Sequence, residues 1–563
     1  MHIGIIGGGP SALFMLKRIV ESTKSGLTVS IFEKKQKLGV GMPYSHEGAC
    51  REHITNVSGN EIPELVTTVE DWVGMNGETA VNYNITVKNF NDYKVLPRLL
   101  FGEYLSQQFD FLLIKAKRAG LEVNVHLSTE IIDIKDLPLN DKVEIYALDG
   151  RIFTFDKVVV CSGHYWPKSH EGSISGYFDS PYPPQKLAHI VNRPIAIRGA
   201  SLTAIDALRT LALNNGTFEI SDNRKMIYQL RQDCAEFRII LHSRNGLLPA
   251  VRFHLEDSHL AKDSVLDAEE VERVRKENGG FLPLDHVYRR NFLNGLKDNR
   301  PEFYELIKEL SLEDFVELMM IRREDTAAFD LLKAEYAEAE RSIALKRSVY
   351  WKEMLAVLSF AMNYPAKYFS GEDMLRLQKT LMPLISIVIA FAPQNSVEEM
   401  IALYDAGVLK LVSVGEKGEI EVRKEGGIYY HLLEATGQKI SLFYDTFIDC
   451  IGQPHLKYEQ VPFPSLINDQ TISPARIRFK DRQNAIAGIA AGNEQVHLAE
   501  DGNYYLKVPG VTIDDHFRVI DGAGRTNKRI HMMAVPFIGG YNPDYSGLDF
   551  GEAASARIIE KLI

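Results

Sequence analysis

The stretch HIGIIGGGPSA, residues 2–12, decides the fold class of this sequence. A short apolar strand leads into Gly7-x-Gly9-x-x-Ala12, and LFMLKRIVES after it has the apolar spacing of a helix. In a strand–turn–helix unit of this kind, Gly7 allows the tight turn and Gly9 lets backbone approach a pyrophosphate. Ala12 allows close packing of helix on strand. The stretch therefore predicts a dinucleotide-binding domain, as opposed to a glycine turn that only packs a helix on a strand.

The next strand strengthens this prediction. GLTVSIFEKK ends on Glu33, 21 residues after Ala12, where the fingerprint places an acid for the ribose hydroxyls. LGVGMPYS follows, and Gly41 in this loop is expected close to the phosphates of the cofactor, the alternative being a plain glycine turn. Asn56, in a polar stretch after it, is a candidate for the edge of a flavin ring or for an ordinary surface loop.

Composition limits the classes of function. The 563 residues are 45% hydrophobic and 25% charged, and the net charge of −11 argues against binding of nucleic acid or of an anionic membrane. The longest apolar run, residues 381–392, is too short to span a bilayer. The four cysteines form no C-x-x-C pair, which predicts neither a redox dithiol nor a metal site. With the nucleotide fold starting at residue 2, no signal peptide is expected, and we expect a cytoplasmic protein.

Residues 95–165 continue the nucleotide-binding pattern. VLPRLLFGEYL leads into a helix that reaches about residue 119, and Arg98 ahead of it is a candidate for phosphate or for an ion pair. Residues 121–134 and 142–155 alternate apolar and polar side chains, which predicts antiparallel strands. DKVVVCSGHYWP then reads as a buried strand that ends in Gly163, where backbone can approach a cofactor.

A second fingerprint begins at Arg193. RPIAIRGASLTAIDALRTLAL contains Gly199-x-Ser201-x-x-Ala204, with Ser201 at the position of the middle glycine. The strand after it ends in His242-Ser243-Arg244 and has no acid in the ribose position. Serine and arginine there suit a 2′-phosphate, so NADPH is preferred over NADH.

The remainder has two parts. Residues 256–395 carry helical periodicity and few glycines, which predicts a helical insertion. The tail reads as a strand, a loop from Ile538 to Gly551 and a closing helix. This loop is positioned to offer backbone amides to the pyrimidine side of a flavin, or is a helix start with no ligand.

Seven motifs occur in the order known from one family. HIGIIGGGPSA, LGVGMPYS, LPRLLFGEYL, VVVCSGH, GASLTAIDA, HSRNGLLP and the C-terminal glycine-rich loop resemble FAD–NAD(P)-binding proteins related to class B flavin monooxygenases. The resemblance covers nearly the whole chain except the helical insertion. It implies an α/β fold with two Rossmann-like domains, one for FAD and one for NAD(P)H, and that insertion. The implied order is an FAD-binding part over 1–185, an NAD(P)H-binding part over 186–255, the insertion over 256–395, a second NAD(P)H-binding part over 396–445, and a final FAD-binding part over 446–563.

The resemblance also implies an activity. We expect an enzyme that is reduced by NADPH and oxygenates a small molecule with O2 through a C4a-hydroperoxyflavin. The ketone-oxygenating signature F-x-G-x-x-x-H-x-x-x-[YW] is absent before Arg193, so N-hydroxylation of an amine or amino acid is favoured. The alternatives are an FAD/NAD(P)H oxidoreductase without oxygenation and a non-catalytic flavin-binding protein.

No residue is assigned a catalytic role, because the flavin carries the chemistry. The residues expected to bind a cofactor are Gly7, Gly9, Pro10, Ser11, Ala12, Glu33, Lys34, Gly41, Asn56, Arg98, Gly163, Gly199, Ser201, Leu202, Thr203, Ser243, Arg244, Asp549 and Gly551.

Overall fold

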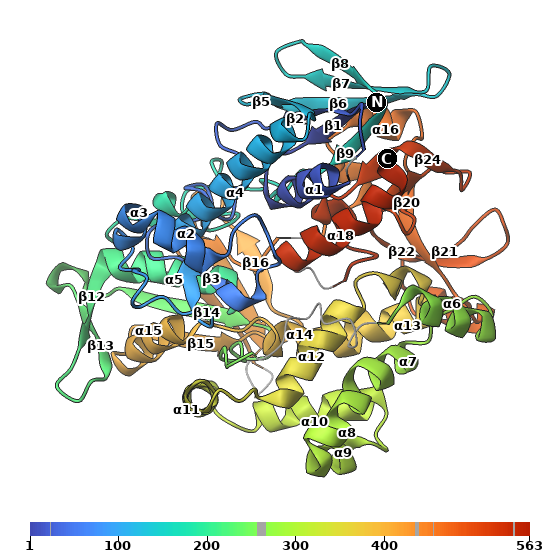
Figure 1. Cartoon of the computed structure of the whole chain (residues 1–563). Coiled ribbons are helices and arrows are strands. Elements are labelled where there is room, and N and C mark those ends of the chain that lie inside the picture. The colour runs from blue at the N-terminus through green and yellow to red at the C-terminus, as the bar shows by residue number, and fades with distance from the viewer. Residues whose placement is uncertain (23, 256–265, 434–437, 454, 544–546) are drawn as a thin grey trace.

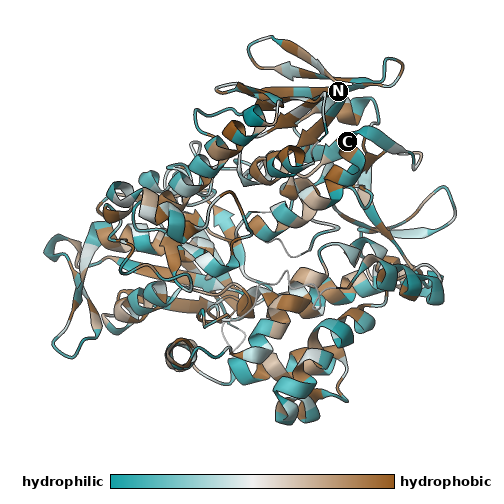
Figure 2. Cartoon of the chain, in the orientation of Figure 1, coloured by the Kyte–Doolittle hydropathy of each residue, from teal (hydrophilic) through white to brown (hydrophobic). Residues whose placement is uncertain are grey.

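The computed structural model describes residues 1–563 except 23, 256–265, 434–437, 454 and 544–546. Two largely parallel β-sheets form its centre, and a region of short helices lies beside them (Figure 1). In Figure 2 the apolar residues concentrate in the strands and on the helix faces that cover them. The expected fold class, with two Rossmann-like halves and a helical insertion, is confirmed.

The first sheet has six strands in the order β23-β24-β9-β1-β2-β5. All neighbours are parallel except β23 and β24. Helices cover one face and the antiparallel strands of residues 131–155 lie against the other, so its central strands are apolar runs such as Val158–Val160, which are fully buried. Its strands are β1 His2–Ile6, β2 Thr28–Phe32, β5 Glu122–His126, β9 Lys157–Val160, β23 Arg518–Ile520 and β24 Thr526–Met532.

Three long helices pack on this sheet: α1 Pro10–Glu21, α4 Arg98–Arg118 and α18 Gly547–Leu562. The first and last of them lie side by side, so both ends of the chain build one domain (Figure 1). A Cβ on Gly551 of α18 would lie 2.8 Å from the ring of Phe14 on α1. Glycine at this position therefore lets the two helices approach closely.

The second sheet has five parallel strands in the order β10-β19-β11-β14-β15. Helices α5 Leu202–Asn215 and α15 Gln394–Asp405 pack on one face, and the antiparallel strands β16 to β18 cover the other. The strands are β10 Tyr177–Phe178, β11 Pro194–Arg198, β14 Arg238–Ser243, β15 Leu409–Ser413, β16 Glu419–Val422, β17 Ile428–Leu433, β18 Lys439–Tyr444 and β19 Phe447–Asp449.

Two strands of this second sheet differ from the expected domain order. Strands β10 and β19 fall within 1–185 and 446–563, the parts expected to bind FAD, yet they pair with the second sheet. Strand β19 occupies the place beside β11 that β9 occupies beside β1 in the first sheet, so β19 belongs to the second sheet. The remaining domain boundaries stay predictions.

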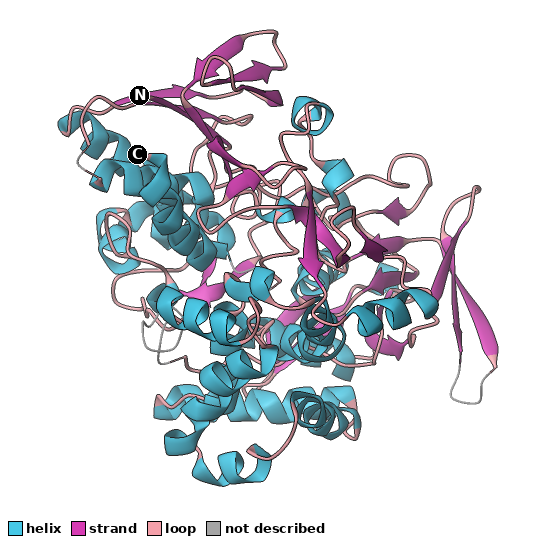
Figure 3. Cartoon of the chain, turned by 90° about the vertical axis from the view of Figure 1, so that its right-hand side faces the viewer, coloured by secondary structure: helices cyan, strands magenta, loops and turns pink. Residues whose placement is uncertain are grey.

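The helical region lies below both sheets in Figure 3, and its start, residues 256–265, is outside the described residues. Its core contains Phe292, Phe315, Leu355 and Leu358, all fully buried. The helices are α6 Ala268–Glu277, α7 Leu284–Tyr288, α8 Asn294–Asn299, α9 Pro301–Ile307, α10 Leu312–Glu324, α11 Ala328–Leu345, α12 Tyr350–Ala361, α13 Gly371–Arg376 and α14 Met382–Val388.

Smaller elements complete the fold. Only part of the antiparallel prediction for residues 121–155 is correct, because β5 pairs in parallel with β2 of the first sheet and the antiparallel strands begin at β6. The smaller elements are α2 Val69–Met75, α3 Gly77–Val81, β3 Ile54–Ser58, β4 Val95–Pro97, β6 Ile131–Leu137, β7 Lys142–Ala147, β8 Ile152–Phe155, β12 Gly216–Ile220, β13 Met226–Leu230, α16 Pro464–Asn468, β20 Pro474–Arg478, α17 Arg482–Ala490, β21 Val496–Leu498 and β22 Tyr504–Val511.

Candidate functional site

The first glycine turn, Gly7 to Ala12, connects β1 to α1 at the carboxyl edge of the first sheet. Gly7 has a φ of +97°, and a Cβ there would lie 2.7 Å from the carbonyl oxygen of Cys161, just after β9. Its amide donates to the carbonyl oxygen of Phe32 at 2.8 Å. The turn is therefore pressed between two neighbouring strands, and only glycine fits at its first position.

Helix α1 begins with backbone amides that no side chain of the described residues caps. Gly9 is the N-cap and no side chain caps it; Pro10 follows and has no N–H. The first main-chain bond of the helix runs from the amide of Leu13 to the carbonyl oxygen of Gly9. This leaves the amides of Ser11 and Ala12 directed out of the helix end, where the helix dipole favours an anion.

A second loop lies directly against this helix start. The amide of Gly39 donates to the carbonyl oxygen of Gly8 at 2.7 Å. A Cβ on Gly9 would lie 3.3 Å from the Cα of Gly41, and Gly41 itself has a φ of +54°. Two backbone segments without side chains thus pack directly against each other, and no side chain at these positions blocks the approach of a diphosphate to the adjacent helix amides.

The acid expected at the ribose position is buried. Glu33 directly follows β2, and its carboxylate accepts from the amide of Gly8 at 2.7 Å and from that of Lys35 at 2.9 Å. Lys34 beside it is exposed. The buried hydroxyl of Ser162, after β9, has no hydrogen-bond partner within the described ranges. A polar atom left unpaired at this edge, with the glycine geometry, fits a bound dinucleotide.

The second glycine turn, Gly199 to Ala204, repeats the first. Gly199 has a φ of +103°, and a Cβ there would lie 2.7 Å from the carbonyl oxygen of Cys450, just after β19. Its amide donates to the carbonyl oxygen of His242 at 2.8 Å. Gly7 with Cys161 and Gly199 with Cys450 therefore occupy equivalent places in the two sheets.

Helix α5 begins after this turn with Ser201 as its N-cap. The Ser201 side chain makes no capping hydrogen bond, and Leu202 and Thr203 supply the first amides of the helix. At the end of β14, Ser243 is buried with a hydroxyl that has no partner in the described part of the chain. Arg244 next to it is exposed. The helix amides, the Ser243 hydroxyl and the Arg244 guanidinium are hydrogen-bond donors that suit a phosphate. Ser201, however, adds a side chain where the fingerprint has none.

The carboxyl edges of the two sheets meet. His164 follows Gly163 after β9, Gln453 follows Gly452 after β19, and the His164 Nδ1 contacts the Gln453 Oε1. Trp166 stacks near His164, with 5.6 Å between ring centroids. Gln453 could not be predicted from the sequence, because only the fold brings these two loops together.

A buried ion pair joins the two nucleotide-binding regions at Arg98. Its Nη1 donates to the Oδ2 of Asp206 on α5 at 2.5 Å, and the Tyr182 hydroxyl donates to the same oxygen at 2.6 Å. Burial alone would raise the pKa of Asp206, but the Arg98 guanidinium, with His53, holds it below its ordinary value. Arg98 thus has a carboxylate partner here, and a role toward phosphate stays a prediction.

The start of α18 carries the last two expected residues. Asp549 lies in the first turn of the helix, and burial, with Glu552 close by, raises its pKa to about 7. Gly551 contacts Phe14, which gives it a packing role between helices. Residues 544–546 of the expected loop lie outside the described residues.

Two other expected residues lie at the surface. Asn56 is exposed, and its carbonyl oxygen accepts from the buried guanidinium of Arg252. Gly163 is exposed too, with open space where a Cβ would stand. Neither placement assigns a ligand to these positions. Within the described ranges, no cluster of three or more His, Cys, Asp or Glu is arranged to hold a metal ion.

Comparison with known families agrees with this geometry. Residues 4–165 match the family described as FAD-NAD(P)-binding. The amino-terminal part of this chain is therefore similar to FAD-NAD(P)-binding domains. The expected resemblance to FAD–NAD(P)-binding proteins is thereby confirmed, and the match agrees with the expected FAD and NAD(P)H cofactors, while the choice of NADPH stays a proposal. Residues 267–389, within the helical insertion, match the YdhS-like middle domain.

One relative matches most of the chain in sequence. The chain is 28% identical to the uncharacterized protein YdhS of Escherichia coli (strain K12) over 473 residues, which cover 82% of this chain and 85% of the relative.

Among solved structures, the chain is similar at low sequence identity to two monooxygenases and one hydroxylase. One is the cadaverine monooxygenase DfoA of Erwinia amylovora bound to FAD, at 11% identity, a TM-score of 0.44, and coverage of 100% of this chain and 94% of that one. Another is the ornithine hydroxylase PvdA of Pseudomonas aeruginosa, at 11% identity and a TM-score of 0.47, with coverage of 100% of this chain and 99% of that one. The third is the L-lysine 6-monooxygenase of Pseudomonas syringae, at 12% identity and a TM-score of 0.45, with coverage of 100% of this chain and 98% of that one. In the described part of the chain, no helix has the length and apolar character needed to cross a membrane.

Proposed function

We propose that the protein is an FAD-dependent, NADPH-reduced monooxygenase that acts on a small molecule, with N-hydroxylation of an amine or amino acid as its reaction. One observation carries the proposal. Two equivalent glycine turns lie at the carboxyl edges of two parallel sheets, and these edges meet through His164 and Gln453. This arrangement suits two dinucleotides whose reactive rings must approach each other.

The chain's own groups would bind and orient the cofactors. FAD, when bound, supplies the redox chemistry between NADPH, oxygen and substrate. The amides of Ser11 and Ala12 would hold its diphosphate, and Glu33 would accept hydrogen bonds from its ribose. At the second turn, the start of α5 would hold the NADPH diphosphate, while Arg244 would pair with the 2′-phosphate.

One ionisable group near the proposed site is suited to hold a proton. Burial, with Glu552 beside it, raises the pKa of Asp549 to about 7, so its carboxyl is partly protonated near neutral pH. It lies in the first turn of α18, next to the loop expected at the pyrimidine side of the flavin. Asp549 would therefore exchange a proton with a polar ring edge there.

The test is to mix FAD-loaded protein with NADPH in air and to follow flavin absorbance and oxygen. We expect the flavin to bleach on reduction and to recover its colour in air. Oxygen uptake should rise with one member of a panel of primary amines and amino acids, with formation of a hydroxylated product. No bleaching, and no oxygen uptake with any amine, would contradict the proposal.

A second candidate is favoured by Ser201, whose side chain stands where a nucleotide-binding turn has glycine. In that case the protein binds FAD but is not reduced by NADPH, or passes electrons without oxygenating a substrate. The same experiment separates these cases. Bleaching without hydroxylated product indicates an oxidoreductase, whereas bound FAD that NADPH does not bleach indicates a non-catalytic flavin protein.

A further inference from the structure

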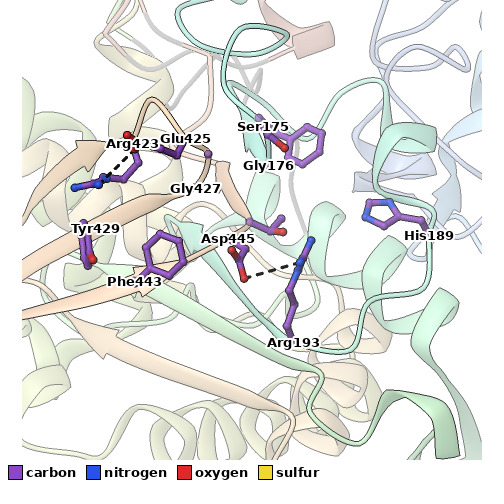
Figure 4. Close-up of a pocket in the computed structure, with 13 residues that line it drawn as sticks. Ser175, Gly176, His189, Arg193, Arg423, Glu425, Gly427, Tyr429, Phe443 and Asp445 are labelled. Atoms are coloured by element: carbon purple, nitrogen blue, oxygen red, sulfur yellow. Dashed lines mark ion pairs between the residues drawn. The ribbon is translucent and has the colours of Figure 1, made fainter.

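A cavity of about 470 Å³ lies on the second sheet, away from both glycine turns (Figure 4). Arg193 directly precedes β11 and Asp445 precedes β19, so the cavity opens at the amino edge of the sheet. Gly199 directly follows β11 at the carboxyl edge. At about 3.3 Å per residue, the five residues of β11 separate the two edges by roughly 16 Å. A ligand in this cavity would not occupy the second glycine turn.

The cavity is framed by close backbone approaches. The amide of Gly427 donates to the carbonyl oxygen of Ser175 at 2.9 Å, and the amide of Phe447 donates to that of Gly176 at 2.8 Å. Gly176 has a φ of +75°, and a Cβ there would lie 1.9 Å from the carbonyl oxygen of Asp445. Three segments are thus held together around the cavity by hydrogen bonds and by a glycine that no other residue could replace.

One wall is aromatic. Tyr429 of β17 and Phe443 of β18 face each other across neighbouring strands, with 5.3 Å between ring centroids (Figure 4). Phe443 is 48% exposed, although it belongs to a strand that packs on the sheet. An exposed aromatic ring beside a cavity offers a face on which a planar ring can stack.

Charged groups lie across from this wall. Arg193 and His189 come from the segment before β11 (Figure 4). Arg193 pairs with Asp445 only loosely, at 3.9 Å and with both side chains 55% exposed, and such pairs contribute little. Its guanidinium is therefore available to a carboxylate or phosphate, which it can bind bidentately. Asp445, and Glu425 beside its partner Arg423 at 3.4 Å, would accept hydrogen bonds from amino groups on a ring.

We propose that this cavity is a second ligand site, for a small molecule that carries an anionic group on a planar aromatic unit. The ring would stack on Phe443, because the guanidinium of Arg423 already lies over the Tyr429 ring at 5.4 Å, and the anionic group would pair with Arg193. Two sources share this chemistry, a nucleotide and an aromatic carboxylate.

The test uses the full-length protein loaded with FAD and saturated with NADP+, so that AMP cannot bind at either glycine turn. AMP, benzoate and inorganic phosphate are titrated separately by calorimetry. We expect AMP or benzoate to bind with a Kd below about 1 mM and phosphate to bind at least about tenfold more weakly, because it lacks the ring. Tighter AMP binding identifies a nucleotide site, and tighter benzoate binding identifies an aromatic carboxylate site.

Two variants test whether the ligand binds in this cavity. Phe443→Ser removes the stacking face and Arg193→Gln removes the cation, and each should weaken binding about tenfold. Leu433→Ser, an exposed residue of the same small sheet, and Arg525→Gln, an exposed arginine elsewhere, serve as matched controls that should leave binding unchanged. The proposal is wrong if neither ring compound binds below about 10 mM. It is equally wrong if phosphate alone binds as tightly, or if both variants bind like the wild type.

Discussion

The guanidinium of Arg98 on α4 and the carboxylate of Asp206 on α5 form a buried ion pair, 2.5 Å between Nη1 and Oδ2. The first residue lies within residues 4–165, which match the FAD-NAD(P)-binding family, and the second lies on the helix that follows the second glycine turn. Tyr182 donates to the same carboxylate, and the His53 ring contacts the carbonyl oxygen of Asp206. The pair therefore fixes how the two nucleotide-binding regions lie relative to each other.

Arg98→Met should destabilise the protein by about 3 kcal/mol, because it leaves the buried Asp206 carboxylate without its cation. Urea denaturation of the protein without FAD measures this loss. Arg525→Met, which removes the exposed partner of Asp521, should cost less than about 1 kcal/mol. If Arg98→Met keeps full stability and loses only FAD affinity, Arg98 serves the cofactor instead.

The equivalence of the two glycine turns leads to a second prediction. Gly7→Ala and Gly199→Ala should each cost about 2 kcal/mol or more, since both residues have a positive φ and a Cβ would lie 2.7 Å from a carbonyl oxygen. Gly77→Ala, with open space at its Cβ, is the control and should be tolerated. Thermal melting compares the three variants. Equal melting temperatures for all of them would disprove the close packing of Gly7 and Gly199.

Ser201→Gly should improve NADPH binding about fivefold, because it removes a side chain from the start of α5 where the diphosphate approaches. The helix itself loses only a few tenths of a kcal/mol, since glycine is an acceptable N-cap. Titration calorimetry with NADPH on both proteins measures the change. Weaker binding by the glycine variant would show that the Ser201 hydroxyl contacts the nucleotide.

Asp549 should make stability depend on pH. Its pKa is about 7 in the folded protein, against about 3.9 for an unfolded aspartate, so between these values the folded state binds more protons. The contribution of Asp549 to stability therefore falls as pH rises from about 4 to 7. Asp549→Asn removes this dependence, so the variant should gain stability relative to wild type toward pH 7.

Chemical denaturation at several pH values between 4 and 8 measures that difference. The exposed Asp298→Asn is the matched control, and its difference from wild type should stay constant. A constant difference for Asp549→Asn as well would mean that Asp549 titrates as an ordinary carboxyl.

The sequence predicted most of the first sheet and both glycine turns because these depend on local rules. A tight turn needs glycine, a helix start leaves amides unpaired, and buried parallel strands are apolar runs. Gly7 and Gly199 could therefore be located without any tertiary information. The helical insertion could be predicted equally well, since helical periodicity is a local property of the sequence.

Long-range pairing was not predictable. Strand β5 alternates in the manner of an antiparallel strand, yet it pairs in parallel with β2 because of the helix α4 that precedes it. Arg98 and Asp206 are 108 residues apart, and no local pattern links them. The same holds for His164 with Gln453, 289 residues apart, and for the cavity beside Phe443, whose walls come from four segments.

The most direct test of the central claim is FAD affinity in Gly9→Ala. Gly9 has an ordinary φ of −82°, and an added Cβ would lie 3.3 Å from the Cα of Gly41, at a tight contact beside the helix amides that are expected to bind the diphosphate. FAD titration of the apoprotein should show affinity reduced roughly thirtyfold, or about 2 kcal/mol, with folding retained and with Gly77→Ala binding like the wild type. Wild-type protein that takes up no FAD, or a Gly9→Ala variant that binds it unchanged, would contradict the account.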